Sequence, residues 1–338
     1  MLRAVINNKQ NAVVEEVPLP QPQDNEIVIK IASALTCGSD KISWCSGTRL
    51  AIGREFSGTV HAVGANVHKF QVGQAVMTTC CSSCHKCDYC LRGKESYCAN
   101  FDDHSAIHGI AQFVLLPADV VAYNTFLKPD SLSFTQAAFL EPLSLVMHSL
   151  NQLTIHNEDT VVILGSGALG LLQLLAIKAT ASPQRIILVD TENHSLYLAR
   201  QLGADHTVNS HEENLQEAIK RYTQNYGAQI IIDNANVPES WDCMLSLASK
   251  AATLLTCGGC PSEHLLQLDA TRVHYDQMTI LGACNYSSQD VAQAQRLLAS
   301  GALDPQPLVT ASLPLTDINK AFQELSLGEA IKFAIIPN

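Results

Sequence analysis

Residues 161–170 read Val-Val-Ile-Leu-Gly-Ser-Gly-Ala-Leu-Gly, an apolar run that ends in a G-x-G-x-x-G turn. The run Val161–Leu164 predicts a buried strand, and the apolar residues that follow predict a helix over 169–181. Asp190 ends the next predicted strand, twenty residues after Gly170. A strand, a glycine turn, a helix and an acid at this spacing are typical of a dinucleotide-binding unit.

Each glycine of this turn has its own physical task. Gly165 permits the tight bend, Gly167 lets backbone approach a pyrophosphate, and Gly170 lets the helix pack close to the strand. Asp190 can accept hydrogen bonds from both ribose hydroxyls and repels a 2′-phosphate, so NAD is favoured over NADP. The alternative is a turn that binds nothing, with Asp190 as a cap of its strand. The predicted cofactor-binding residues here are Gly165, Ser166, Gly167, Ala168, Leu169, Gly170 and Asp190.

The surrounding sequence predicts how the rest of the chain is organised. Predicted strands at 161–164, 185–190, 229–233 and 253–257 alternate with predicted helices at 141–153, 169–181, 195–202 and 241–249. This alternation predicts a doubly wound parallel sheet with helices on both faces. The first 140 residues predict short strands with turns, including 26–31 and 113–117, and a polar loop lobe over 80–98. The tail predicts one helix, 289–300, and one strand, 331–336, which is too little for a domain of its own.

A second motif consists of four closely spaced cysteines, Cys84, Cys87, Cys90 and Cys98. Their spacing, C-x2-C-x2-C-x7-C, lets four thiolates surround one tetrahedral Zn²⁺ and leaves no position for a substrate, which predicts a structural zinc. His85 can replace one thiolate, although four sulfurs make that unnecessary. Four buried free thiols are the alternative. Cys80 and Cys81 lie outside the spacing and are expected to be bystanders.

Bulk composition narrows the class of protein. The chain has 338 residues, 47% of them apolar and 16% charged, which is enough for two domains with a large core. A net charge of −11 argues against nucleic acid as a partner, because a phosphate-binding face needs clustered Lys and Arg. No run reaches the roughly 18 apolar residues of a membrane span. Twelve cysteines without a signal peptide favour reduced thiols and a cytoplasmic location.

The sequence resembles the zinc-containing medium-chain alcohol and polyol dehydrogenases, closest to the sorbitol, threonine and sugar-alcohol branch. Beside the cysteines, the segments that carry the resemblance are 37–40 (C-G-S-D), 53–60, 140–144 (L-E-P-L-S), 165–170, 202–205 and 328–332. The resemblance implies a GroES-like β-rich catalytic domain over 1–145, a Rossmann NAD-binding domain over 146–282, and a return of 283–338 to the first domain. It also implies a small-molecule substrate and a homodimer or homotetramer.

In similar enzymes a catalytic zinc is held by the cysteine of C-G-S-D, by the His-Glu pair of a G-H-E motif, and by the acid of an E-P motif. These positions map here to Cys37, to Arg54 with Glu55, and to Glu141. Arg54 stands where the histidine is expected, and a guanidinium cannot ligate zinc because it has no free lone pair.

Two forms of this site therefore stay open. In the first, zinc persists on Cys37, Glu55 and Glu141 with a water molecule, as a weaker Lewis acid than a histidine-bound ion. In the second, the metal is absent, and Arg54 pairs with Glu55, Glu141 or Asp40, fills part of the charge vacancy, and polarises a carbonyl or holds an anionic substrate. A plainer interpretation is that Arg54 is an exposed strand arginine. His108 and His148 are further candidates for the missing ligand. They would supply it from elsewhere in the sequence.

The reaction implied by the resemblance is reversible oxidation of a secondary alcohol by NAD, on a polyol, sugar or amino alcohol. Ser39 would accept the hydroxyl proton, Asp40 would support the site, and Cys257 with Gly258 would flank the nicotinamide. Ile42 occupies the position of a relay histidine, and 285–286 reads Asn-Tyr where polyol dehydrogenases often carry Arg-Tyr. The alternative function is a catalytic-zinc-free reductase or an NAD-binding homologue without activity.

Overall fold

The apolar run ahead of the glycine turn forms β8 (Thr160–Leu164), and all five of its residues are buried in the computed structural model. It lies inside a six-stranded parallel sheet with the order β10-β9-β8-β11-β12-β13. The other strands are β9 (Arg185–Asp190), β10 (His206–Asn209), β11 (Ala228–Asp233), β12 (Ala248–Thr256) and β13 (Thr279–Gly282). The strand order reverses between β8 and β11, and ligands of such sheets bind outside the carboxyl ends of the strands at that point.

Helices cover both faces of this sheet. They are α5 (Ala168–Thr180), α6 (Asn193–Gln201), α7 (Leu215–Tyr222), α8 (Pro238–Leu247) and α9 (Ala270–Tyr275). Successive residues of a strand point to opposite faces. Val162 of β8 packs in one core cluster with Ala218 of α7 and Met244 of α8. The neighbouring Ile163 faces the other side, where a Cβ added to Gly170 of α5 would lie 3.3 Å from its side chain.

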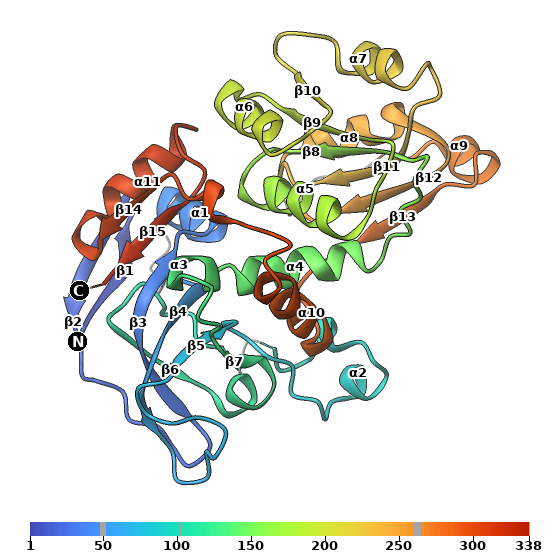
Figure 1. Ribbon diagram of the computed structural model, residues 1–338. Helices are drawn as coiled ribbons and strands as arrows, with labels where there is room; N and C mark the ends of the chain where they lie inside the picture. The colour runs from blue at the N-terminus through green and yellow to red at the C-terminus, as the bar shows by residue number, and fades with distance from the viewer. Residues whose placement is uncertain (48–51, 102, 104, 260–264, 266, 338) are drawn as a thin grey trace. The chain divides into compact units, whose positions relative to one another are not determined.

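The chain divides into two units (Figure 1). The second unit, His148–Cys284, contains the parallel sheet, whereas Met1–Met147 and Asn285–Asn338 together form the first unit. The helix α4 (Leu140–Leu150) spans the boundary. The structure describes residues 1–47, 52–101, 103, 105–259, 265 and 267–337.

The first unit contains a seven-stranded sheet with the order β14-β15-β3-β4-β5-β7, in which β6 also pairs with β3. Its strands are β3 (Ile27–Leu35), β4 (Glu55–Val63), β5 (Ala75–Thr78), β6 (Phe113–Leu116), β7 (Thr125–Leu127), β14 (Ala311–Pro314) and β15 (Phe333–Ile336). The tail of the chain joins this sheet, because β15 pairs antiparallel with β3. Phe56, Phe322 and Phe333 are among the largest side chains that are fully buried in its core.

A hairpin and several helices complete the first unit. The hairpin is β1 (Leu2–Asn8) with β2 (Asn11–Glu16), and the helices include α1 (Gly38–Ser46), α2 (Asp88–Leu91), α3 (Phe134–Ala137), α10 (Ser288–Ala299) and α11 (Ile318–Ser326). The sequence pattern did not predict α1, since Asp40 and Trp44 are its only buried residues and no apolar stripe marks it. The lobe 80–98, predicted as loop, carries two single turns, α2 and a 3₁₀ turn at Glu95–Tyr97. Among the described helices, none is long and apolar enough to cross a bilayer.

Candidate active site and metal centre

The four motif cysteines come together in the lobe of the first unit. The sulfur atoms of Cys84, Cys87, Cys90 and Cys98 all lie within 4.8 Å of one another. Backbone N–H groups point at them: Cys84 donates to the sulfur of Cys98 at 3.2 Å, and Cys87 donates to the sulfur of Cys84 at 3.4 Å. Backbone hydrogen bonds, first from Cys90, lower the pKa of Cys87 to about 6. Four thiols at this separation fit one tetrahedral zinc ion.

His85 does not belong to this quartet. Its ring Nε2 lies 3.1 Å from the hydroxyl of Ser83 and 3.2 Å from the hydroxyl of Ser288, at the start of α10. Glu95 accepts hydrogen bonds from the Ser83 hydroxyl at 3.0 Å and from the Ser288 backbone at 2.9 Å. His85 therefore helps to tie the lobe to α10 rather than replacing a thiolate.

The glycine turn has the geometry that each of its glycines requires. Gly165 has φ +90°, a region that favours glycine, and a Cβ there would lie 3.0 Å from the backbone nitrogen of Ala235. A Cβ on Gly170 would lie only 1.9 Å from the carbonyl oxygen of Gly165, so the helix could not pack as it does. A Cβ on Gly167 would meet no atom within 4 Å. Gly167 therefore opens onto free space, where a ligand can approach the backbone at the start of α5.

Asp190 lies at the end of β9, beside this turn. One carboxylate oxygen accepts hydrogen bonds from the Ser166 backbone at 2.5 Å and the Ser166 hydroxyl at 2.9 Å. The other accepts from the Thr191 and Glu192 backbones at 2.7 and 3.1 Å. Asp190 thus caps its strand, which is the alternative role considered above, and the same bonds hold its negative charge at the glycine turn.

Cys257 and Gly258 follow β12 at the same edge of the parallel sheet. Both backbone N–H groups donate to the carbonyl oxygen of Asp233 at 2.9 Å. The side-chain amide of Gln173 lies 3.6 Å from the Cys257 sulfur, and burial raises the pKa of this thiol to about 11. Cys257 is therefore a neutral thiol near pH 7, suited to packing rather than to nucleophilic chemistry.

The first unit buries an ion pair beside the C-G-S-D segment. The Lys332 ammonium donates to Glu55 at 2.6 Å and to the Thr36 carbonyl at 2.8 Å, and the Lys332 and Glu55 side chains are each 4% exposed. Cys37 hydrogen-bonds Glu55, and the Ser39 hydroxyl donates to the Cys37 sulfur at 3.2 Å. Burial and the neighbouring carboxylates raise the pKa of Cys37 to about 12, so the thiol stays protonated. Burial also raises the pKa of Glu55, although Lys332 acts against that rise.

Glu141 has a separate set of partners. One carboxylate oxygen accepts hydrogen bonds from the Cys80 backbone and the Tyr286 hydroxyl, each at 2.7 Å. The Cys80 thiol donates to the other oxygen at 3.4 Å and lies 3.2 Å from the Cys81 sulfur. Burial raises the pKa of Glu141 to about 7. Cys80 is thus not a bystander, and its contact with Glu141 joins segments that are 61 residues apart in the sequence.

Arg54 and Asp40 lie in the same part of the first unit. Arg54 directly precedes β4, is half-buried, and makes no hydrogen bond or ion pair with the residues that the structure describes. The expected pairing of Arg54 with Glu55, Glu141 or Asp40 is therefore wrong. Burial acts to lower the pKa of Arg54, but the electrostatic effect of nearby acidic groups is larger and raises it. These groups are Cys80, Cys81, Cys37 and Glu141. Asp40 accepts a hydrogen bond from the Gly53 backbone at 3.2 Å, and burial raises its pKa to about 7.

These contacts test whether a second metal ion fits. Among the described residues, the cysteine quartet is the single group of three or more His, Cys, Asp or Glu side chains whose ligand atoms are close enough to hold an ion. Cys37, Glu55 and Glu141 do not form such a group, and neither His108 nor His148 adds to one. Glu55 is occupied by Lys332, and Glu141 by Cys80 and Tyr286. As arranged, these side chains do not fit a second zinc.

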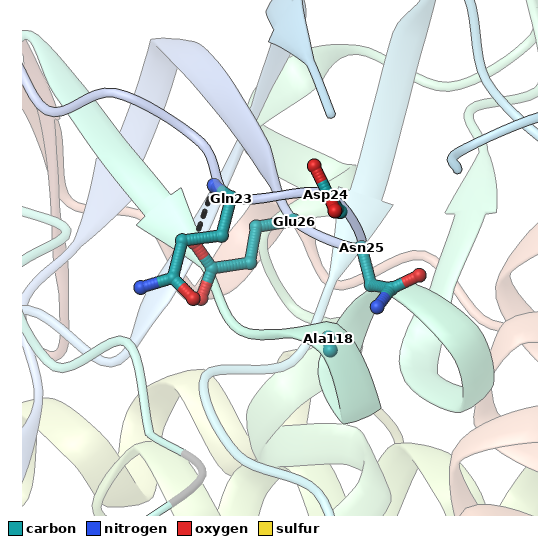
Figure 2. Close-up of a pocket in the computed structure, with 5 residues that line it drawn as sticks. All are labelled: Gln23, Asp24, Asn25, Glu26 and Ala118. Carbon is teal, nitrogen blue, oxygen red and sulfur yellow. Dashed lines mark hydrogen bonds between the residues drawn. The ribbon is translucent and has the colours of Figure 1, made fainter. Parts of the chain in front are cut away.

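A surface hollow lies elsewhere on the first unit (Figure 2). It is lined by Gln23, Asp24, Asn25, Glu26 and Ala118, and it contains none of the predicted site residues. The Gln23 backbone donates to the Glu26 carboxylate at 2.9 Å, which closes a local turn. Nothing in its lining points to chemistry.

Two family models match the chain. A model described as "Alcohol dehydrogenase GroES-like domain" matches residues 23–125, and one described as "Zinc-binding dehydrogenase" matches residues 168–300.

Similar proteins match along nearly the whole chain. L-threonine 3-dehydrogenase of Bacillus subtilis is 30% identical, covering 96% of this chain and 95% of that protein. Sorbitol dehydrogenase of the same organism is 28% identical, and the match covers 100% of this chain and 98% of that protein. The crystal structure of galactitol-1-phosphate dehydrogenase from Escherichia coli superposes with a TM-score of 0.87 at 26% identity, with full coverage of both chains. The likeness therefore extends over both units and every segment that carries a predicted site residue.

Proposed function

Because the chain belongs to the zinc-type medium-chain alcohol and polyol dehydrogenase family, we propose that it oxidises a secondary alcohol of a polyol, sugar or amino alcohol to a ketone, with NAD as acceptor. The observation that carries this proposal is the glycine turn at the carboxyl end of β8. There Gly167 opens onto free space, and the Asp190 carboxylate is fixed beside the turn.

The proposed coenzyme contacts follow from these residues of the second unit. NAD, when bound, takes up a hydride at its nicotinamide ring. The backbone at Gly167 and the start of α5 would hold the pyrophosphate, because N–H groups at a helix start favour an anion. The Asp190 carboxylate would accept hydrogen bonds from free ribose hydroxyls and repel a 2′-phosphate. Cys257 and Gly258 follow β12, which is separated from β8 by β11, at the same edge of the sheet, and they would line the nicotinamide.

The residues proposed to act on the alcohol belong to the first unit. In the proposed reaction the carbinol C–H bond breaks with its electron pair leaving as hydride, and the hydroxyl proton is taken up by the protein. Ser39, whose hydroxyl donates to Cys37, would pass this proton on. Asp40 and Glu141 are acceptors of suitable strength near neutral pH, since burial raises the pKa of each carboxyl to about 7.

The remaining assignments concern the whole protein. The cysteine quartet would hold one structural zinc, which stabilises the lobe without contacting substrate. We further propose the domain limits 1–145, 146–282 and 283–338, a cytoplasmic location, a small-molecule substrate without nucleic-acid or membrane partners, and a homodimer or homotetramer.

The test is reduction of NAD or NADP, followed by absorbance at 340 nm, over a panel of polyols, sugars and amino alcohols. We expect NAD to be preferred by at least tenfold. Asp190→Ala should remove most of that preference, because the charge that repels a 2′-phosphate is lost. Asp242→Ala, which removes an exposed carboxylate from α8, is the matched control and should keep it. A protein that binds NADH in calorimetry but oxidises no alcohol would support the non-catalytic alternative.

A further inference from the structure

Arg54 is a cation without a hydrogen-bonding or ion-pair partner among the residues that the structure describes. It directly precedes β4, is half-buried, and forms no hydrogen bond or ion pair with any described residue. A guanidinium carries five N–H donors in one plane, and a partly desolvated charge without a partner is costly. Such a group is suited to receive an anionic ligand.

The groups around Arg54 are already committed to other contacts. Glu55 is paired with Lys332, which also donates to the Thr36 carbonyl. Glu141 accepts hydrogen bonds from Cys80 and the Tyr286 hydroxyl. The Cys37 sulfur accepts a hydrogen bond from the Ser39 hydroxyl, and the Asp40 carboxyl accepts one from the Gly53 backbone. Within the described part of the chain, none of these acids therefore forms a hydrogen bond or an ion pair with the guanidinium.

A second metal ion does not account for this arrangement. A zinc ion at Cys37, Glu55 and Glu141 would have to displace Lys332 and Tyr286, and the described side chains form no ligand group there. It would also lie in the region where Arg54 already provides positive charge. A fixed cation and a divalent ion in one small site repel each other.

We propose that Arg54 replaces the second metal ion as the positive charge of the substrate site, and that it binds an oxyanion, a carboxylate or phosphate group, on the alcohol substrate. This inference rests on the proposed function and narrows its substrate class. A neutral alcohol group offers one acceptor oxygen to the guanidinium. A carboxylate or phosphate instead accepts two parallel N–H hydrogen bonds and neutralises the positive charge of Arg54. The substrate class is thus a sugar acid or a polyol phosphate rather than a neutral polyol.

The first experiment measures metal content by elemental analysis of purified protein. We expect one zinc per chain in the wild type. This zinc should be lost when Cys98→Ser removes one thiolate of the quartet. Two zinc ions per wild-type chain, with the second bound in proportion to activity, would overturn the proposal.

The second experiment compares kcat/KM for sorbitol, sorbitol 6-phosphate and gluconate. We expect one of the two anionic alcohols to exceed the neutral one by roughly 10- to 100-fold, as expected for hydrogen bonds to a charged group. The phosphate and carboxylate arms show which oxyanion is used. A wild type that prefers sorbitol would contradict the inference.

Variants of Arg54 separate its charge from its bulk. Arg54→Met should reduce the preference for the anion to within about threefold, and Arg54→Lys should keep part of it, because a lysine retains the charge but not the fork. Arg296→Met, on the exposed side of α10, is the matched control and should behave as wild type. A preference that is unchanged in Arg54→Met would refute a role for the guanidinium.

Binding measurements distinguish failure of this inference from failure of the proposed function. Isothermal titration of gluconate and sorbitol 6-phosphate into the NADH complex needs no turnover. If no alcohol is oxidised yet one anion binds in an Arg54-dependent way, the inference stands and the proposed reaction falls. If alcohols are oxidised and neither anion binds better than sorbitol, the inference falls alone.

Discussion

Replacing Lys332 with methionine should destabilise the first unit by about 3–5 kcal/mol, because it leaves the Glu55 carboxylate buried without its cation. At an effective dielectric constant of about 20, unit charges 2.6 Å apart attract by about 6 kcal/mol, and most of this offsets the cost of burying both groups. The Thr36 carbonyl also loses its donor. Because the carboxyl then resists ionisation further, the loss should be larger at pH 8 than at pH 5.

Tryptophan fluorescence can report the unfolding of the first unit and thus the loss of its stability. The chain has two tryptophans, so a Trp241→Phe background leaves Trp44, which is buried in the first unit and donates to Asn319 at 3.0 Å. Urea unfolding of Lys332→Met in this background gives the free energy. Adding Glu55→Gln should recover more than half of the loss, because the unpaired charge is removed. A loss below about 1 kcal/mol, with no pH dependence, would refute the reasoning.

Three further predictions concern other parts of the chain. Asp40→Asn should leave the unfolding free energy at pH 4 unchanged but raise it by on the order of 2–4 kcal/mol above pH 7, as measured by urea unfolding. The reason is that the folded Asp40 carboxyl, with a pKa of about 7, holds a proton that the unfolded chain releases. A wild type whose stability does not fall as the pH rises from 4 to 7 would contradict this. Gly170→Ala should lower the unfolding free energy of the second unit by roughly 1–3 kcal/mol, because the added methyl group clashes with the backbone carbonyl of Gly165. Gly167→Ala should have the unfolding free energy of the wild type but bind NADH at least tenfold more weakly in calorimetry. Removing zinc with a chelator should expose four thiols to a thiol reagent and lower the melting temperature; an unchanged thiol count would oppose the structural-zinc assignment.

The second unit was largely predictable from its sequence, for a local reason. Each central strand of a parallel sheet is buried on both faces, so it appears as a short apolar run between turn residues. The predicted strand 185–190 matches β9, and the predicted strand 161–164 differs from β8 by one residue. The edge strands β10 and β13 escaped prediction. β13 is mostly exposed and carries little apolar signal.

The first unit was harder because its site is assembled from distant segments. The contact between Glu55 and Lys332 joins residues 277 positions apart, and that between Glu141 and Tyr286 joins residues 145 apart. No local period encodes such pairs. The motif spacing identified the cysteine quartet, and the substitution at Arg54 pointed to an altered site. It could not show that Lys332 already neutralises Glu55.

The pairing of β15 with β3 has a consequence for how the protein is made. The second unit is one continuous segment, so it can fold while the ribosome still adds the tail. The sheet of the first unit is incomplete until Phe333–Ile336 leaves the ribosome, and Glu55 has no ion-pair partner until Lys332 does so. A nascent chain that ends a few codons early would thus contain a folded second unit next to a first unit whose sheet lacks β15, which leaves the edge of β3 unpaired. Quality-control proteases would meet that exposed edge first.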